Sequence, residues 1–382
     1  MNKRKIVILG NGIAIGYSAS YTAVSSILLP FSEDMAVDIA AAGLLFTANC
    51  MGFIGCILFV DLLLAHHDPR KVFLAALAGF SAAQMLFAVS GSFEAAFLAM
   101  VCIGGFQGLI QTHLTELMIE IGGARKTYYI NLNMIFYGLG SLAGPLLTGL
   151  LLHYGQSWRY FYQMTGISTF VIFLLLCREP ITFAKTKEQK REYADSQRFS
   201  TPLLFAALCL FLECGAEVSE WGWMAACFTE DLHFSAAASS LAVGVFGLGQ
   251  ILGRMFCGKL SGRFAPRDMV SVLSAASFVS VLASCLVRKP VVVYLLTLLM
   301  GMAFSGIWPL LVSLGSDYAG GSGGREVSFL IVCGSIGSAT IPYVMGRVGQ
   351  YIGLMAARAL ASFLFLIILL FMRSKRFAVS RR

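Results

Sequence analysis

Glu213, Glu217 and Glu220 stand inside one long apolar stretch of the sequence, residues 202–228. Their i, i+4 and i+7 spacing places the three carboxyl groups on one face of a helix. Ionisable groups at membrane depth are costly and are functional hypotheses by default. The spacing therefore predicts a proton- or cation-coupling site, with Glu217 the stronger candidate than Glu213 and Glu220 nearer the helix end. The alternative is structural: these acids bond the backbone or an Arg across an interface.

Gln107, Gln111 and Thr115 form a second polar stripe, at i, i+4 and i+8 in the apolar run 94–120. Amides and hydroxyls offer paired donors and acceptors without charge. Such a stripe suits recognition of a neutral polyol or sugar. The alternative is hydrogen bonding between helices, which polar residues in membranes often provide.

Aromatic and amide side chains supply further substrate-binding candidates. Trp308 could stack on the apolar face of a sugar, because an aromatic ring with a polar handle suits such a platform. Tyr17 and Tyr21 place polar groups one turn apart in the first apolar run. Asn133 and Tyr137, also one turn apart, do the same in the fifth run.

Three residues near the ends of apolar runs have other expected roles. Arg254 follows Gly253 near the end of the run 237–257 and is expected to help a gate or to extend its charge toward the interface. Trp221 and Trp223 lie nearer the boundary of their run and are expected in the interfacial aromatic belt.

Composition shows which elements must hold these residues. Hydrophobic residues make up 58% of the 382-residue chain and charged residues only 13%, where soluble domains carry about 25% charged residues. A spanning helix needs roughly 20 mostly apolar residues. The sequence predicts an all-α membrane protein with twelve such spans, at 5–29, 40–64, 72–90, 94–120, 129–153, 158–176, 202–228, 237–257, 269–287, 291–313, 326–347 and 352–373.

Basic residues predict the orientation of these spans. With the amino terminus inside, all but five of the 28 Lys and Arg lie on the inner side, the exceptions being Arg159, Arg288, Lys289, Arg347 and Arg358. Since cytoplasmic loops carry the excess of Lys and Arg, both termini are expected on the cytoplasmic side of the membrane. That membrane is expected to be a plasma membrane or a bacterial inner membrane. The net charge of +8 thus follows from orientation and does not indicate nucleic acid.

The two halves of the sequence repeat. GLGSLAGPLLTG at 138–149 resembles CGSIGSATIPYVMG at 333–346. Pro145 and Pro342 differ by 342 − 145 = 197 positions, and the same offset relates Gly104 to Gly301 and the Pro-Arg pair at 69–70 to that at 266–267. This offset predicts two similar six-helix bundles, over 1–176 and 201–382, joined by a cytoplasmic linker at 177–200.

Several classes of function lack support in the sequence. The ten Cys include no CxxC pair, no phosphate-binding Gly-Lys-Ser/Thr motif is present, and no Ser or Cys has a convincing base nearby. We therefore expect no cofactor, no metal site and no enzymatic activity. The expected partners are the lipid bilayer, a small-molecule substrate and a coupling proton or cation. A monomer suffices for this architecture.

These features resemble the major facilitator superfamily over nearly the whole chain. GKLSGRFAPR at 258–267 is similar to the inner-loop signature of that family, with Gly262 in place of its Asp, and the matching loop at 61–71 is more degraded. The resemblance implies two six-helix bundles that rock around a site near the bilayer midplane.

Within that family the chain resembles the fucose–proton symporter group most. The similar segments are SSILLP at 25–30, GGFQGLIQTHLTE at 104–116, ECGAEV at 213–218, SGIWPLLVSLG at 305–315 and IGSATIPYVMG at 336–346. In that group the first and fourth helices each carry a membrane-embedded carboxylate, where this chain has Ser26 and Gln111. Coupling through those two carboxylates is therefore not implied.

The sequence favours a secondary active transporter for a small polar solute such as a sugar, coupled to a proton or cation through Glu217 or Glu213. GPLLTG at 144–149 also resembles a motif of drug antiporters, so efflux of drugs or metabolites remains an alternative. A non-transporting nutrient sensor is less favoured, because such proteins often add long soluble extensions.

Overall fold

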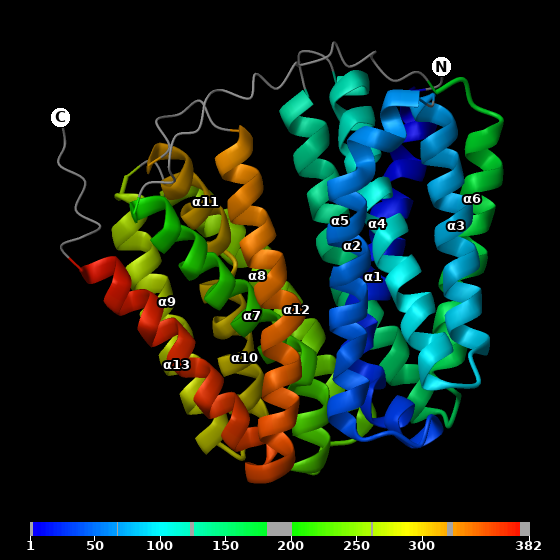
Figure 1. The fold of residues 1–382 in the computed structure, drawn as a ribbon. Helices are drawn as coiled ribbons and strands as arrows, with labels where there is room; N and C mark the ends of the chain where they lie inside the picture. Colours follow the sequence, from blue (N-terminus) through cyan, green and yellow to red (C-terminus); the bar gives the residue numbers. More distant parts are fainter. Residues whose placement is uncertain are drawn as a thin grey trace.

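The computed structural model describes residues 3–66, 68–122, 126–181, 201–260, 263–318 and 324–374, and within these ranges every regular element is an α-helix (Figure 1). The helices are α1 (Lys3–Asp34), α2 (Ile39–His66), α3 (Pro69–Val89), α4 (Phe93–Gly122), α5 (Lys126–His153), α6 (Arg159–Cys177), α7 (Thr201–Glu230), α8 (Ala236–Leu260), α9 (Pro266–Leu286), α10 (Pro290–Phe304), α11 (Ile307–Tyr318), α12 (Gly324–Ile352) and α13 (Leu354–Arg373).

Twelve segments of the described chain are long and apolar enough to cross a membrane, which confirms the predicted number of spans. One of them, Pro290–Gly315, is broken between α10 and α11 at Ser305 and Gly306. Pro309 explains the break, because a proline ring clashes with the carbonyl four residues earlier, here that of Ser305.

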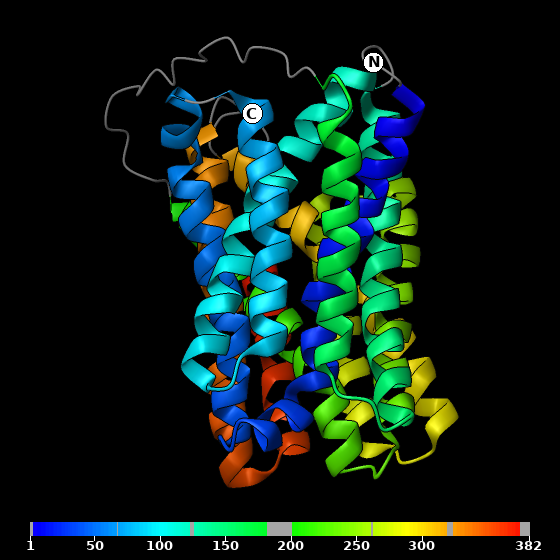
Figure 2. The ribbon, with the colours of Figure 1, turned by 90° about the vertical axis from the view of Figure 1, so that its right-hand side faces the viewer.

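The helices form two groups, α1 to α6 and α7 to α13 (Figures 1 and 2). The start of α1 and the end of α13 lie toward one face, which we call the terminal face, and the opposite face is the far face. Between the groups α2 packs against α12, α5 against α8, and α1 against α7 and α8. The domain boundaries at 176 and 200 remain a proposal, since residues 182–200 lie outside the described part of the chain.

Glycines pack the two groups in the same register. A Cβ added at Gly52 would lie 1.9 Å from the carbonyl oxygen of Val101, and one at Gly249 would lie 2.3 Å from that of Leu298. Both residues of the second pair are 197 positions after those of the first. Only glycine lets α2 approach α4, and α8 approach α10, this closely.

Polar contacts at the far face repeat with the same offset. Trp158 donates its indole N–H to Asp34 Oδ2 at 3.2 Å, and the Met355 backbone N–H donates to Asp231 Oδ2 at 3.0 Å. The offsets are 231 − 34 = 197 and 355 − 158 = 197. Each aspartate ties the end of the first helix of its group to the start of the last.

The predicted Pro-Arg pairs form a matching contact at the terminal face. Arg70 donates to the carbonyl of Cys177 at 3.2 Å, and Arg267 donates to that of Ser374 at 2.9 Å. These acceptors stand at the ends of α6 and α13 and are again 197 positions apart. The predicted repeat is thus confirmed by the contacts that hold each group together.

Candidate site between the two halves

Glu217 and Gln250 meet at the surface where the second group of helices faces the first. The Gln250 side-chain amide donates a hydrogen bond to Glu217 Oε1. Tyr21 on α1 and Tyr137 on α5 both interact electrostatically with Glu217. The carboxyl group is half-buried, is bonded to an amide of its own half and lies within electrostatic range of two phenols of the other half.

Further ionisable groups surround this pair. Glu213 is fully buried and interacts electrostatically with Glu217 and with Arg254, whose side chain is exposed. Arg254 also interacts electrostatically with Tyr137 of the other half. We call Tyr21, Tyr137, Glu213, Glu217, Gln250 and Arg254 the central cluster.

Two thiols lie beside the central cluster. Cys214 donates its S–H to Glu213 Oε2 at 3.2 Å, and Cys50 on α2 hydrogen-bonds with Tyr21. Within the described residues, no group of three His, Cys, Asp or Glu side chains is placed to hold a metal ion. The cluster thus brings two carboxyl groups together with phenol hydroxyl, amide and thiol groups.

The sequence pattern missed Gln250, although a signal for it was present. Gln250 and Arg254 are four residues apart in GLGQILGR at 247–254, so they lie on one face of α8. A polar amide on the same face as a predicted gate residue, inside an apolar span, could have marked the contact with α7.

Two predicted substrate-binding residues of the first half are engaged within that half. Asn133 donates its amide to Asn11 Oδ1 at 3.1 Å, and this contact joins α5 to α1. Tyr17 packs its ring against Tyr137, with the ring centroids 5.5 Å apart. Asn133 therefore connects helices, whereas Tyr17 lies behind a member of the central cluster.

The polar stripe of α4 stays apart from the central cluster. Thr115 donates its hydroxyl to the Gln111 carbonyl of its own helix at 2.9 Å. Gln107 is buried, and its Oε1 has no hydrogen-bond partner among the described residues. Since α4 packs on α1, α2, α3 and α5 of its own half, its role in solute binding stays a prediction.

Trp308 lies at the start of α11, directly after the break in the tenth span, and 40% of its surface is exposed. No contact joins it to the central cluster among the described residues. A stacking role for this indole therefore also stays a prediction.

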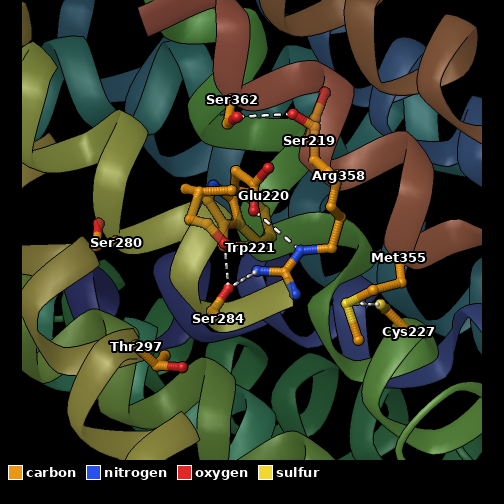
Figure 3. Close-up of polar contacts among 12 residues, drawn as sticks. Ser219, Glu220, Trp221, Cys227, Ser280, Ser284, Thr297, Met355, Arg358 and Ser362 are labelled. Carbon is orange, nitrogen blue, oxygen red and sulfur yellow. Dashed lines mark hydrogen bonds and ion pairs between the residues drawn. The ribbon is translucent and has the colours of Figure 1, made fainter. Parts of the chain in front are cut away.

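Glu220 has a different environment from the other two glutamates. Its Oε2 accepts a hydrogen bond from Arg358 Nε at 2.9 Å, and both side chains have no exposed surface. Figure 3 shows Arg358 of α13 also reaching Ser284 of α9, 3.4 Å away. The guanidinium carbon lies 5.2 Å from the centroid of the Phe228 ring. Glu220 thus ties three helices of the second half together.

Trp221 and Trp223 do not lie in an aromatic belt, and that prediction is wrong. Trp221 is 6% exposed and Trp223 has no exposed surface. The Trp221 ring contacts Tyr21 edge-on, at 5.1 Å between ring centroids. The Trp223 ring fits against Gly43 of α2 and Gly346 of α12. Both indoles therefore seal the junction between the halves and do not meet lipid headgroups.

Asp38 and Arg347 form a latch between the halves at the far face. Arg347 Nη1 lies 3.6 Å from Asp38 Oδ2, and both side chains are largely exposed. Asp38 also caps α2, because its Oδ1 accepts a hydrogen bond from the Ala41 backbone N–H at 2.6 Å. The Ala41 N–H, then the Gln350 side chain and Arg347, hold the pKa of Asp38 below its usual value of 3.8.

The latch is expected to weaken in acid. A carboxyl group whose folded-state pKa is depressed contributes stability above its unfolded-state pKa and loses it as the pH falls through the folded-state pKa. Arg347→Gln should therefore lower the free energy of unfolding at neutral pH by about 0.2–1 kcal/mol. The difference from wild type should shrink as the pH falls through the folded-state pKa of Asp38, which lies below 3.8.

Chemical unfolding in detergent, at neutral pH and at a series of pH values down to about pH 2, measures this difference. Arg288→Gln is the matched control, because the acceptor of the Arg288 hydrogen bond is a backbone carbonyl, that of Asp231. A carbonyl oxygen carries no charge that a change of pH could remove. A deficit of Arg347→Gln that persisted in acid would show that the latch does not depend on the Asp38 charge.

Comparison with known proteins agrees with this architecture. The sequence matches the Major Facilitator Superfamily twice, over residues 11–217 and 206–381. It is 24% identical over 277 residues to a TsgA homolog of Yersinia enterocolitica, covering 70% of this chain and 69% of that protein. It is 19% identical over 230 residues to a TsgA homolog of Buchnera aphidicola, where it spans only 58% of the relative.

Solved transporter structures share the fold. The nucleoside transporter NupG superposes with a TM-score of 0.80 at 12% identity, covering 99% of this chain and all of that one. An inward-facing bacterial homolog of the human lysosomal transporter Spinster gives 0.77 at 12% identity, with 99% of both chains covered. The E. coli fucose:proton symporter FucP gives 0.60 at 17% identity over the full length of both chains.

The two matched stretches together span the twelve apolar segments, and each begins within or just before the first helix of one half. The chain therefore belongs to the Major Facilitator Superfamily, a family of multi-pass membrane transporters and not of enzymes.

Proposed function

We propose that this transporter binds a small, largely neutral, hydroxyl-rich solute such as a sugar at the central cluster and couples its movement to a proton. The observation that carries the proposal is the Glu217–Gln250 hydrogen bond, which faces Tyr21 and Tyr137 of the other half. A solute bound there touches both halves and so responds to their relative movement.

The residue types of the central cluster suit such a solute. A phenol both donates and accepts a hydrogen bond, and an amide offers two donors and an acceptor. Tyr21, Tyr137 and Gln250 can therefore satisfy several hydroxyl groups, while the tyrosine rings cover apolar ring faces. Arg254 balances the charge of one glutamate, so the site is neutral, and suited to a neutral ligand, once the other glutamate carries a proton.

Glu213 and Glu217 supply the coupling. Two like charges in a partly buried site repel each other strongly. A proton bound at Glu217 relieves this repulsion, and its release restores it. Occupation of the site by solute thereby depends on protonation.

Transport follows by alternating access of the two halves around the central cluster. At the far face the two halves are held in contact by the Trp223 ring, which fits against α2 and α12, and by the Asp38–Arg347 latch. The likeness of the fold to an inward-facing Spinster homolog supports the view that this conformation opens toward the terminal face. The excess of basic residues at that face supports its cytoplasmic location.

Uptake into proteoliposomes tests the proposal with a panel of radiolabelled monosaccharides, polyols and nucleosides, with and without an imposed pH gradient. One coupled proton supports at most about tenfold accumulation per unit of pH gradient, because each unit is worth about 1.4 kcal/mol. Glu217→Gln should equilibrate the solute without accumulating it.

Glu94→Gln is the matched control, because Glu94 is exposed in the first turn of α4, away from the central cluster, and it should accumulate solute as wild type does. Accumulation that survived in Glu217→Gln would remove the coupling assignment. Raised tolerance of expressing cells to cationic drugs, without uptake of any panel solute, would favour efflux instead.

A further inference from the structure

Two cavities lie between the halves on the far-face side of the central cluster. The first, of ≈ 180 Å³, is lined by Ser25, Ser26, Glu33, Thr229, Ser239 and Ser240 among others. The second, of ≈ 20 Å³, is lined by Thr22, Ser141, Trp221, Gly247 and Gln250 among others. We call them the outer and the inner cavity.

The cavities lie one above the other. Ser25 of the outer cavity and Thr22 of the inner cavity are three residues apart on α1, and Ala225 and Trp221 are four residues apart on α7. A helix advances one turn over that spacing. The inner cavity ends at Gln250, which is bonded to Glu217. The two cavities therefore stand in line between the exposed side chain of Glu33 and the central cluster.

An asymmetry in the repeat explains why this path is hollow. Trp223 fills the space beside Gly43 and Gly346. The equivalent residue of the first half is Ser26, since 223 − 26 = 197. Ser26 lines the outer cavity. One side of the far-face junction is thus closed by an indole, and the equivalent place on the other side holds only a hydroxyl.

Both cavities can hold water. A cavity needs roughly 10–15 Å³ and two to four polar partners to hold one water molecule. In the inner cavity the hydroxyls of Thr22 and Ser141 donate to backbone carbonyls, and their lone pairs remain to accept from water. In the outer cavity Ser26 Oγ is buried without a hydrogen-bond partner among the described residues. The lone pairs of Thr22 and Ser141 are thus free to accept hydrogen bonds from a water molecule in the inner cavity.

We propose that the two cavities form a water-filled proton path from the far face to Glu217, separate from the route of the solute. The inference rests on the proposed proton coupling at Glu217. A protonated water of the inner cavity gives its proton to the Glu217 carboxylate, so that one O–H bond breaks on the water and one forms at the carboxyl group; the proton has come from the far face through the cavity waters, and no electron moves. At rest, the Gln250 amide donates its hydrogen bond to the Glu217 carboxyl group at the end of the inner cavity. During the transfer, water takes the place of that amide.

The other charged and titratable groups around Glu217 favour this route for the proton. Glu213 and Cys214 stand on the same helix, while Tyr21, Tyr137 and Arg254 face Glu217 from α1, α5 and α8. None of these groups lines either cavity; Glu217 does not line them either, but it is bonded to Gln250, which lines the inner one. Glu33 is the ionisable group at the outer mouth, where its carboxylate attracts protons.

Gly247→Ala plugs the path with little disturbance. A Cβ at Gly247 would meet nothing nearer than backbone atoms of Leu142 and Ser141, at 3.7 and 3.8 Å, so its methyl group occupies the inner cavity. Alanine is also the better helix former. Gly16→Ala is the matched control, because its Cβ would meet only Thr169 Oγ1 at 3.8 Å, on the α6 side of α1.

The experiment measures water and protons separately. X-ray radiolytic labelling should oxidise Trp221 in wild type and in Gly16→Ala, and several-fold less in Gly247→Ala, with buried Trp223 as internal reference. In proteoliposomes, Gly247→Ala should slow uptake driven by a pH gradient about tenfold. Exchange of labelled for unlabelled solute should not change, because exchange takes up no net proton from the far face.

Equal labelling of Trp221 in wild type and Gly247→Ala would overturn the proposed path, as would reduced labelling with unchanged uptake. Either result leaves the proposed function intact if Glu217→Gln still fails to accumulate solute. Accumulation by Glu217→Gln would instead remove the proposed coupling, and the path with it. Slower exchange in Gly247→Ala would show that the methyl group obstructs the solute and would also contradict a separate route.

Discussion

Arg358→Met is expected to lower the free energy of unfolding by about 3–5 kcal/mol, because it leaves the carboxylate of Glu220 buried without its partner. Neither side chain has any exposed surface, and the bond between them is 2.9 Å long. The same change removes the contacts of the guanidinium with Ser284 and the Phe228 ring. Chemical unfolding of the purified protein in detergent measures the loss.

A double variant separates loss of the pair from loss of packing. Glu220→Leu combined with Arg358→Met should recover most of the stability, because well-packed apolar residues often replace a buried ion pair at little cost. Arg347→Met is the control for losing an exposed arginine, and it should cost at most about 1 kcal/mol. A double variant as unstable as Arg358→Met would mean that the shape of these side chains, and not their charge, holds α7 to α13.

Trp223→Ala should be as damaging, at about 3–5 kcal/mol, because removal of a buried indole leaves a cavity that the surroundings fill only in part. Trp223 is fully buried, and its indole N–H donates to the Pro342 carbonyl at 2.9 Å. Its ring also fills the junction between Gly43 of α2 and Gly346 of α12. The variant therefore loses both core packing and contact between the halves.

Unfolding in detergent again measures the cost. Trp308→Ala provides the matched tryptophan control, since its indole is 40% exposed and its loss should cost less than about 1 kcal/mol. A Trp223 variant no less stable than the Trp308 variant would show that α2 and α12 close the gap by themselves.

Sequence patterns predicted the large-scale architecture because those patterns are local or internal to the chain. Each span is a continuous apolar run that the bilayer requires. The repeat showed itself as an offset of 197 in short motifs such as Pro145 and Pro342, and the glycine contacts of Gly52 and Gly249 follow the same offset. Pro309 likewise indicates a helix break at Ser305, because a proline ring clashes with the carbonyl four residues earlier.

The sequence by itself determined that three glutamates share one face of the seventh span, but only the tertiary structure decided what each of them meets. Glu217 and Glu220 are three residues apart, which is about 60° around a helix axis. That angle is enough to turn Glu217 toward Gln250 and the first half, and Glu220 toward Arg358 inside its own half. Periodicity gives the direction of a side chain on its own helix. The neighbour in that direction depends on helices brought together from far along the chain, and so Glu220 and Trp223 came to hold the fold together while Glu217 faces the junction between the halves.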